Sequence, residues 1–221
     1  MILLALDTSS SAVTVAVHDG SSVVAERTEF GAQAHGELLA PTIAAVLSDA
    51  SVGVDQLTVI VAGVGPGPFT GLRVGLVTAR VMSEALAIPA HGFCSLDALA
   101  AQAVAEGTVS TPFAVATDAR RKEVYLATYD EGGSRLTGPE VALPSAVAEL
   151  TANGPVVGEG AALYPSTFAD PRGPRLVSAA WLAVYAVAQM SSGAELGDTA
   201  PMYLRRPDAV ESAGRKRVTQ P

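Results

Sequence analysis

A glycine-rich segment between two predicted secondary-structure elements most constrains the fold of this chain. Residues 63–71 hold four glycines and two prolines, after an apolar run at 57–61 and before a helical pattern at 72–86. When a strand is followed by a turn and then by a helix, backbone N–H groups are exposed at the positive, N-terminal end of that helix. Thr70 is placed to cap the first turn of the helix. The segment can therefore hold an anion or serve as a rigid packing corner. Short glycine patterns often arise by chance, which favours the packing corner.

The first half of the chain carries the signals of a mixed sheet flanked by helices. Three strand patterns come first, and their short connections predict an antiparallel meander over residues 2–6, 12–17 and 23–30. Helical patterns then alternate with apolar runs: a helix at 37–50, a strand at 57–61, a helix at 72–86, a strand at 90–93 and a helix at 96–105, for which Ser95 is the expected N-cap. Helical connections predict that the later strands pair parallel.

The second half of the chain repeats the start of the first. Asp7 precedes a strand pattern that begins at Val13, and Asp118 precedes one that begins at Val124. The pattern continues with a strand at 135–141, a helix at 144–150, a strand at 155–158 and a helix at 179–190 capped by Ser178. We therefore expect two related lobes, residues 1–106 and a less regular 107–206, followed by a flexible polar tail at 207–221.

Charge and composition exclude several classes of protein. The net charge is −8, so the chain lacks the basic footprint of a protein that binds nucleic acid by itself. Its basic clusters, Arg120-Arg121-Lys122 and Arg215-Lys216-Arg217, are small and are interpreted as solvated surface. No apolar run reaches the roughly 18 residues that a membrane span needs. Cys94 is the single cysteine, which excludes an internal disulfide, fits a reducing cytoplasm and predicts a buried, unreactive thiol.

Residue chemistry gives little support for catalysis. Asp7 can act as a Mg²⁺ ligand or as a turn-capping carboxylate, and the polar run at 8–11, which contains no glycine, favours the cap. The histidines His18, His35 and His91 lie far apart in the sequence, so none is paired at the helical spacing that two metal ligands need. We therefore predict no catalytic residue and no metal ligand.

Five segments, in order along almost the whole chain, resemble one bacterial family. They are LALDTS (4–9), HGELLAP (35–41), GPGPFTGLR (65–73), DARRKEVY (118–125) and PMYLR (201–205). They are similar to the TsaB (YeaZ) family, and the glycine-rich block is the most specific of them. The resemblance implies two RNase H-like lobes of the actin, Hsp70 and sugar kinase (ASKHA) class. The family usually has Ser in place of Gly36 and of Pro68, and Pro68 removes a backbone donor from any phosphate cradle.

The resemblance also implies a function. Family members are required to form N6-threonylcarbamoyladenosine at position 37 of ANN-decoding tRNAs, as non-catalytic partners of the transferase TsaD, and the ATPase TsaE joins the same assembly. From this we expect a cytoplasmic scaffold that has no activity alone, binds no cofactor alone and meets tRNA only through the complex. The alternative is an active ASKHA-type phosphotransferase or acyltransferase that uses Asp7 and the glycine-rich loop.

Two helices are the expected partner surface. The helices at 37–50 and 72–86 carry apolar residues on more than one face, so either a partner covers them or they are buried within their own domain. The resemblance implies that they pair with the equivalent helices of TsaD or with a second copy of the chain. It places the contacts at His35, Glu37, Leu38, Leu39, Ile43, Leu72, Arg73, Leu76, Ala79 and Arg80. ATP or ADP at this junction would contact Gly65, Gly67, Thr70 and Arg73.

Overall fold

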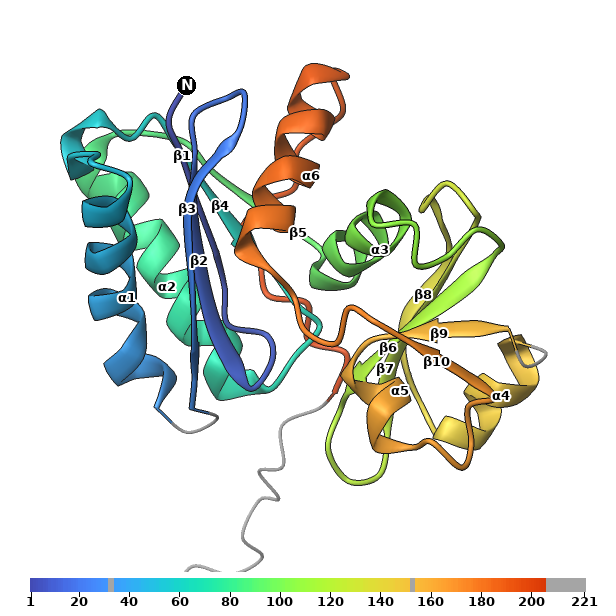
Figure 1. Cartoon of the computed structure of the whole chain (residues 1–221). Helices are drawn as coiled ribbons and strands as arrows, with labels where there is room; N and C mark the ends of the chain where they lie inside the picture. Colours follow the sequence, from blue (N-terminus) through green and yellow to red (C-terminus); the bar gives the residue numbers. More distant parts are fainter. Residues whose placement is uncertain (32–33, 152–153, 206–221) are drawn as a thin grey trace, which may run out of the picture.

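The computed structural model describes residues 1–31, 34–151 and 154–205. They form two lobes, each built on a five-stranded sheet (Figure 1). The elements of the first half are β1 (Leu3–Asp7), β2 (Ala12–His18), β3 (Val23–Phe30), α1 (His35–Asp49), the 3₁₀ turn η1 (Val54–Gln56), β4 (Val59–Gly63), α2 (Phe69–Leu86), β5 (Ala90–Phe93) and α3 (Ser95–Ala105). Those of the second half are β6 (Phe113–Asp118), β7 (Val124–Tyr129), β8 (Arg135–Ala142), α4 (Pro144–Thr151), β9 (Pro155–Val157), α5 (Glu159–Leu163), β10 (Asp170–Arg172) and α6 (Ala179–Ser191). Among the described helices, none has the length and apolar character to cross a membrane.

The first sheet has the strand order β3-β2-β1-β4-β5. Strands β1, β2 and β3 pair antiparallel across short turns, whereas β4 and β5 run parallel because helices connect them. Every residue of β1 and β4 is buried, which explains why their sequences are nearly unbroken apolar runs. Asp7 ends β1 opposite Thr14 of β2.

The second sheet repeats this arrangement with the order β10-β9-β6-β7-β8. Strands β6, β7 and β8 are antiparallel, β9 is parallel to β6, and β10 is parallel to β9. Asp118 ends β6 opposite Val124, as Asp7 ends β1. The predicted fold class, two RNase H-like lobes with mixed sheets flanked by helices, is confirmed by this duplicated topology.

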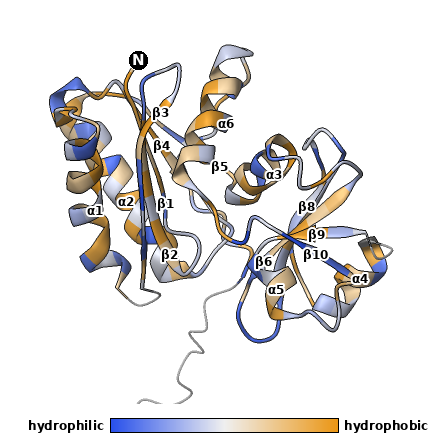
Figure 2. Ribbon diagram, viewed as in Figure 1, coloured by the Kyte–Doolittle hydropathy of each residue, from blue (hydrophilic) through white to orange (hydrophobic). Residues whose placement is uncertain are grey.

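The apolar side chains gather in three cores between the layers. Helices α1 and α2 cover one face of the first sheet, and α3 and α6 lie between the two sheets (Figure 1). A third core joins the outer face of the second sheet to α4 and α5 around Leu126, Val147 and Phe168. Figure 2 shows the inner strands β1 and β4 of the first sheet as largely apolar and the β6–β7 connection as hydrophilic. The core around α3 and α6, which we call the middle core, contains residues of both sheets and therefore holds the two lobes together.

Helix α6 belongs to the second half of the chain but packs on the first sheet. Ser178 caps it as predicted, because its Oγ accepts a hydrogen bond from the Trp181 N–H at 3.2 Å. The Ala179 N–H donates to Thr14 Oγ1 on β2 at 3.0 Å, and Ser178 Oγ donates to Glu26 on β3 at 2.7 Å. The first sheet is therefore completed by a helix from beyond the predicted boundary at 106/107.

The division of the chain into 1–106 and 107–206 stays a prediction. The predicted tail at 207–221, with Arg215-Lys216-Arg217, lies outside the described residues. The polar strand β10 and the five-residue helix α5 were not predicted, because such short elements give no periodic signal.

Two predicted helix caps are wrong. Helix α2 begins at Phe69 and has no side-chain cap, so Thr70 lies inside its first turn. Ser95 is the first residue of α3, which also has no side-chain cap. Its hydroxyl has a partner in β1, described below, and is therefore turned away from its own helix.

Candidate functional site

The glycine-rich segment packs against the turn that follows β1. A Cβ atom on Gly63 would lie 1.7 Å from Asp7 Oδ2, and one on Gly67 would lie 2.3 Å from the carbonyl oxygen of Ser9. Neither distance leaves room for a side chain, so glycine is required here for the close approach of two segments. Of the two interpretations of this segment, the structure favours the packing corner.

Thr8 joins the same turn to the start of α2. Its hydroxyl donates to the carbonyl oxygen of Gly71 at 2.8 Å and accepts from the Gly75 N–H at 3.2 Å. A Cβ atom on Gly75 would lie 2.4 Å from Thr8 Oγ1. Backbone groups near the start of α2 are therefore bound to the protein itself.

The Asp7 carboxylate is buried and both of its oxygens accept hydrogen bonds. Oδ1 accepts from the N–H and the hydroxyl of Ser9, each at 2.7 Å. Oδ2 accepts from the Ser95 hydroxyl at 2.5 Å. Burial raises the pKa of Asp7, although these donors act in the opposite direction. Asp7 thus closes its own turn and holds α3, as the capping interpretation predicted.

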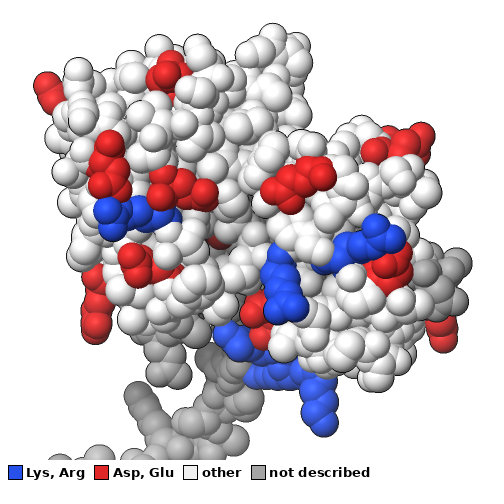
Figure 3. Space-filling view, viewed as in Figure 1, with Lys and Arg blue, Asp and Glu red and all other residues white. Residues whose placement is uncertain are grey.

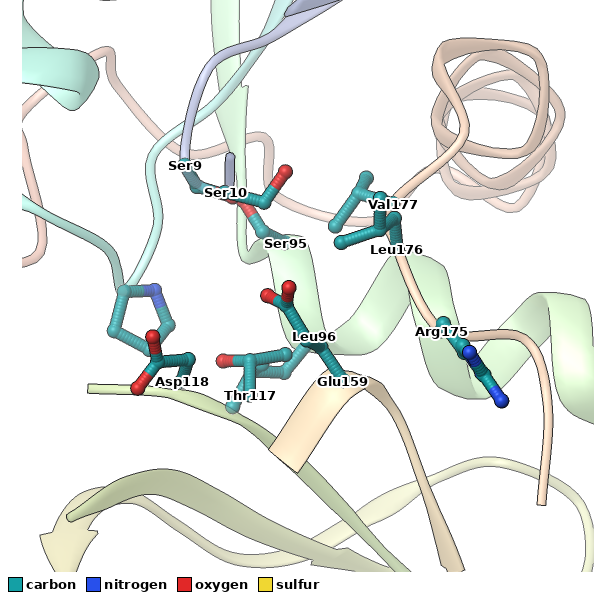
Figure 4. Close-up of a pocket in the computed structure, with 11 residues that line it drawn as sticks. Ser9, Ser10, Ser95, Leu96, Thr117, Asp118, Glu159, Arg175, Leu176 and Val177 are labelled. Carbon is teal, nitrogen blue, oxygen red and sulfur yellow. The ribbon is translucent and has the colours of Figure 1, made fainter. Parts of the chain in front are cut away.

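The space between the lobes at this point is narrow. A cavity of about 10 Å³ lies between serines of the first lobe and polar residues of the second (Figure 4): Ser9, Ser10, Ser95, Thr117, Asp118 and Glu159. That volume is about enough for one water molecule, whereas sites for small organic ligands measure about 300–1,000 Å³. The interlobe cavity is therefore too small for a nucleotide in this conformation.

Two carboxylates of the second lobe, Asp118 and Glu159, line this cavity (Figure 4). Burial raises the pKa of Glu159, and the charge of Asp118 raises it further. Asp118 itself forms an ion pair with Arg120 at 3.1 Å. Arg175 lines the cavity as well, so carboxylates and a guanidinium meet there.

The four residues predicted to contact a nucleotide lie in different surroundings. Gly65 and Gly67 are buried, whereas Thr70 and Arg73 are exposed on α2. The Gly65 N–H donates to Ser95 Oγ at 3.2 Å, so this donor already has a protein partner. The Gly67 carbonyl oxygen accepts from the hydroxyl of Tyr125, at 3.2 Å. Nucleotide binding by these residues stays a prediction.

Arg73 lies in an aromatic cluster at the start of α2. Its guanidinium stacks on the ring of Phe69, 3.7 Å from the centroid, and its Nε donates to the Tyr203 hydroxyl at 2.9 Å. The Phe69 and Tyr203 rings are 4.9 Å apart. Tyr203 belongs to the last described segment, residues 197–205, which we call the C-terminal strap.

The C-terminal strap crosses the junction between the lobes. Its backbone bonds to β5 through Gly92 and to the glycine-rich segment through Val64, at 3.0 and 2.9 Å. Arg80 of α2 donates to the hydroxyl and the carbonyl oxygen of Thr199, at 2.8 and 2.6 Å. At its end, Arg205 donates to the carbonyl oxygen of Ala119 at 2.6 Å and forms an ion pair with Glu123. Sequence patterns gave no signal for these contacts, because each joins residues far apart in the chain.

Several residues predicted to contact a partner are instead inside the monomer. His35 is buried, and its Nε2 lies 3.0 Å from the Ser10 carbonyl oxygen. Four apolar residues are buried because they lie on the side of α1 and α2 that faces the first sheet: Leu39, Ile43, Leu76 and Ala79. Leu72, near the start of α2, is also fully buried. The placement of these six residues on an open surface is therefore wrong. Leu38 is half-buried, and Glu37, Arg73 and Arg80 are exposed.

A different side of the same helices faces the solvent. Val77 and Val81 of α2 are 56% and 60% exposed, and Phe69 is 38% exposed. On α1 the small residues Ala40, Pro41 and Ala44 are exposed. We call these six residues the docking face. Exposed apolar side chains that follow one another along a helix are typical of surfaces that bind other proteins.

Two further sequence predictions concern the cysteine and possible metal ligands. Cys94 is buried, and burial raises the pKa of its thiol to about 12. Within residues 1–31, 34–151 and 154–205, no three His, Cys, Asp or Glu side chains lie close enough together to hold a metal ion.

The known proteins compared below match between 58% and 94% of this chain. The family model described as TsaD, tRNA N6-adenosine threonylcarbamoyltransferase, matches residues 22–197. An uncharacterized protein of Mycobacterium tuberculosis (strain H37Rv) is 40% identical over 94% of this chain and 93% of the relative. The tRNA threonylcarbamoyladenosine biosynthesis protein TsaB of Bacillus subtilis (strain 168) is 33% identical over 58% of this chain and 55% of its own length. The crystal structure of YeaZ-like protein from Pseudomonas aeruginosa superposes with a TM-score of 0.79 at 28% identity, over 92% of this chain and 99% of that one.

Proposed function

Because this chain belongs to the TsaB (YeaZ) family, we propose that it takes part in forming threonylcarbamoyladenosine on tRNA, as a non-catalytic partner of a TsaD-type transferase. A TsaE-type ATPase is proposed as a further member of the same assembly. The proposal has two parts, the absence of a working catalytic centre between the lobes and the presence of a surface for a related subunit.

The filled junction between the lobes supports a non-catalytic role. The alternative, an enzyme that uses Asp7 and the glycine-rich loop, needs a space between the lobes that is large enough for a nucleotide. Here the Asp7 oxygens are bonded to Ser9 and Ser95, and the cavity beside them measures about 10 Å³. An enzyme that used Asp7 would have to break these hydrogen bonds and separate the lobes, which the C-terminal strap and the shared middle core hold together.

The docking face supports binding of a related subunit. It is the observation that carries the proposal, because Val77 and Val81 are apolar, more than half exposed and placed on one side of α2. The family model that describes TsaD matches this chain across α1 and α2, so a TsaD-type subunit is expected to carry the same pair of helices. Two such pairs can meet face to face, and a second copy of this chain is the competing occupant.

Co-elution with a TsaD-type subunit tests the proposal. The double variant Val77→Arg/Val81→Arg should lose co-elution in size-exclusion chromatography while its circular dichroism spectrum stays that of the wild type. Val184→Arg is the matched control, because Val184 is also an exposed helical valine but lies on α6. A tRNA modification assay that omits each component in turn should require this chain and the transferase together.

Two results would contradict the proposal. The first is modification of tRNA, or ATP turnover, by the purified chain alone, with the activity lost in Asp7→Asn; this would favour the phosphotransferase or acyltransferase alternative. The second is normal co-elution of the Val77→Arg/Val81→Arg variant, because the transferase would then bind elsewhere.

A further inference from the structure

The exposed residues of α2 form a ridge that has an arginine within it. Four exposed residues follow one another at intervals of four: Phe69, Arg73, Val77 and Val81. Residues at this spacing line up along one side of an α-helix. Phe69, Val77 and Val81 belong to the docking face, and Arg73 is the charged member of the ridge. A subunit that covers the docking face therefore covers this guanidinium as well.

Two aromatic rings and one hydrogen bond fix the Arg73 side chain. Its guanidinium lies 3.7 Å from the centroid of the Phe69 ring and 5.9 Å from that of Tyr203. Its Nε donates to the Tyr203 hydroxyl at 2.9 Å. Tyr203 follows Met202 in the C-terminal strap, whose backbone N–H donates to Val64 at 2.9 Å. We call Phe69, Arg73 and Tyr203 the arginine anchor, because this cation is held in place before any partner binds.

The charge of Arg73 is not neutralised by its surroundings. Within the part of the chain that the structure describes, Arg73 forms no ion pair, and its Nη1 and Nη2 form no hydrogen bond. Glu84, the acidic residue of α2, lies about three helical turns, or about 16 Å, further along the helix. Arg80 of the same helix differs, because its guanidinium donates two hydrogen bonds to Thr199. The two terminal nitrogens of Arg73 are therefore available to an acceptor outside the chain.

The molecule as a whole is acidic, so such an acceptor gains from Arg73 only at short range. The net charge is −8, and Figure 3 shows acidic side chains spread over both lobes. Interactions between exposed charges are largely screened beyond about 8 Å at physiological salt. Long-range attraction therefore does not bring an acidic partner to this surface. The free energy is gained when the guanidinium is covered.

Covering the Arg73 guanidinium restricts the chemistry of the partner. A charged group that leaves water is destabilising unless an opposite charge and hydrogen bonds replace the water. Its neighbours on the ridge, Phe69 and Val77, are apolar and supply no acceptor. A carboxylate fits best, because its two oxygens can accept from both terminal nitrogens of an arginine at once. A nucleic-acid backbone fits less well, because it needs several free cations and Arg80 is already bonded to the C-terminal strap.

We propose that the arginine anchor binds the carboxylate of an Asp or Glu side chain on the TsaD-type subunit, and that Tyr203 makes the C-terminal strap part of the docking surface. This inference rests on the proposed function, because that subunit is the one expected on the docking face. Arg and Tyr are among the residues that contribute most to protein–protein affinity. A covered charge pair of this kind slows dissociation, whereas a pair at the rim changes the rate of association.

The test measures binding of the full chain to the TsaD-type subunit by surface plasmon resonance, without nucleotide. Arg73→Gln should raise the dissociation constant about 30-fold or more, almost entirely through faster dissociation. The control, Arg172→Gln, removes the same charge from an exposed position on β10 of the second lobe. It should change the dissociation constant by less than about twofold. Both variants should keep the circular dichroism spectrum of the wild type, because both side chains are exposed.

Two further measurements identify the acceptor and the role of the C-terminal strap. Each Asp and Glu on the equivalent pair of helices of the TsaD-type subunit is changed to Asn or Gln, alone and together with Arg73→Gln. For one of these carboxylates, the loss in the double variant should be clearly smaller than the product of the two single losses. Tyr203→Phe keeps the ring but releases Nε of Arg73, and should weaken binding by about twofold to fivefold.

The outcomes separate this inference from the proposed function. If wild type binds and Val77→Arg/Val81→Arg does not, the proposed function stands. The inference is then overturned by wild-type binding of Arg73→Gln or by the absence of coupling to every carboxylate tested. It is also overturned if the effect of Arg73→Gln needs added ATP or ADP, because the acceptor would then be a phosphate.

Self-association of the chain, measured by sedimentation, is the last comparison. If Arg73→Gln loses self-association and keeps transferase binding, a second copy occupies the anchor and the inference is overturned. Unchanged binding of Tyr203→Phe would overturn the part that concerns the C-terminal strap. If wild type does not bind the transferase, the proposed function fails and the inference fails with it.

Discussion

Asp7 and Ser95 lie 88 residues apart in the sequence and meet in a hydrogen bond of 2.5 Å from Ser95 Oγ to Asp7 Oδ2. The same hydroxyl accepts from the Gly65 N–H. One small side chain therefore joins the end of β1, the glycine-rich segment and the start of α3. The junction of these three elements is therefore filled by a serine hydroxyl.

Removing this hydroxyl should destabilise the protein. In Ser95→Ala both the Asp7 carboxylate and the Gly65 N–H lose a partner in a buried site. We expect the free energy of unfolding in urea to fall by about 2–3 kcal/mol at neutral pH. The control is Ser192→Ala, an exposed serine after α6, which should change it by less than about 0.5 kcal/mol. Equal effects of the two substitutions would contradict this role of Ser95.

Burial of Asp7 should make stability depend on pH. Because the pKa of Asp7 is raised above 3.8, the folded state binds this proton more tightly than the unfolded state. The resulting stabilisation is present at low pH and is lost as pH rises through the folded-state pKa. Asp7→Asn cannot ionise. Its free energy of unfolding should therefore rise relative to that of wild type by about 1.4 kcal/mol per pH unit, between pH 3.8 and the folded-state pKa of Asp7. Urea unfolding at a series of pH values measures the difference, and a difference that does not change with pH would refute the prediction.

The glycine-rich segment should not tolerate a methyl group where it meets the turn after β1. Gly67→Ala would place Cβ 2.3 Å from the Ser9 carbonyl oxygen, and we expect a loss of about 3 kcal/mol in thermal or urea unfolding. Gly36→Ala is the control, because a Cβ atom there meets no other atom within 4 Å and lies in the first turn of α1. It should raise stability by about 0.5–1 kcal/mol.

The Cys94 thiol should be inert in the folded protein. Burial raises its pKa to about 12, and the charge of Asp97 acts in the same direction. The thiolate is the reactive form, so a thiol reagent at mildly alkaline pH should modify none of the native protein. After denaturation it should modify one thiol per chain, since Cys94 is the only cysteine. Rapid modification of the native protein would show that this region opens easily.

Loss of the Arg80 side chain should loosen the C-terminal strap. Arg80→Met keeps the aliphatic stem but removes two hydrogen bonds to Thr199. We expect faster hydrogen–deuterium exchange at the Gly92 N–H, which donates to the strap, and at the Met202 N–H, by which the strap donates to Val64. The free energy of unfolding should fall by about 1–2 kcal/mol. Tyr203→Phe, which removes one exposed hydrogen bond to Arg73, should have a smaller effect. Unchanged exchange in Arg80→Met would mean that the backbone bonds alone hold the strap.

Local patterns were sufficient for most of the sheets and helices. The predicted strand at 90–93 coincides with β5, and Ser178 caps α6 as expected. Their signals lie within a few neighbouring residues, namely an apolar run and a capping side chain. The repeat of Asp7 and Asp118 also predicted the duplicated sheets, because each aspartate ends the first strand of its sheet.

The predictions that failed concern side chains whose partners lie far away in the sequence. Ser95 was expected to cap its helix, but its oxygen is bonded to β1. Leu39 and Leu76 were expected at an interface, but they face the first sheet. Two apolar sides of a helix look alike in a sequence, and only the position of the sheet decides which of them is buried. The arrangement of the C-terminal strap depends on tertiary structure for the same reason.

The return of α6 to the first sheet has a consequence for synthesis on the ribosome. Domains usually fold in order as they emerge, yet the face of β1 and β2 that α6 covers stays bare until residues 179–191 have been translated. The first half of the nascent polypeptide therefore cannot complete its core until the second half has been synthesised. A stop codon just before α6 would leave this face of the first sheet uncovered, with apolar surface exposed to chaperones and proteases.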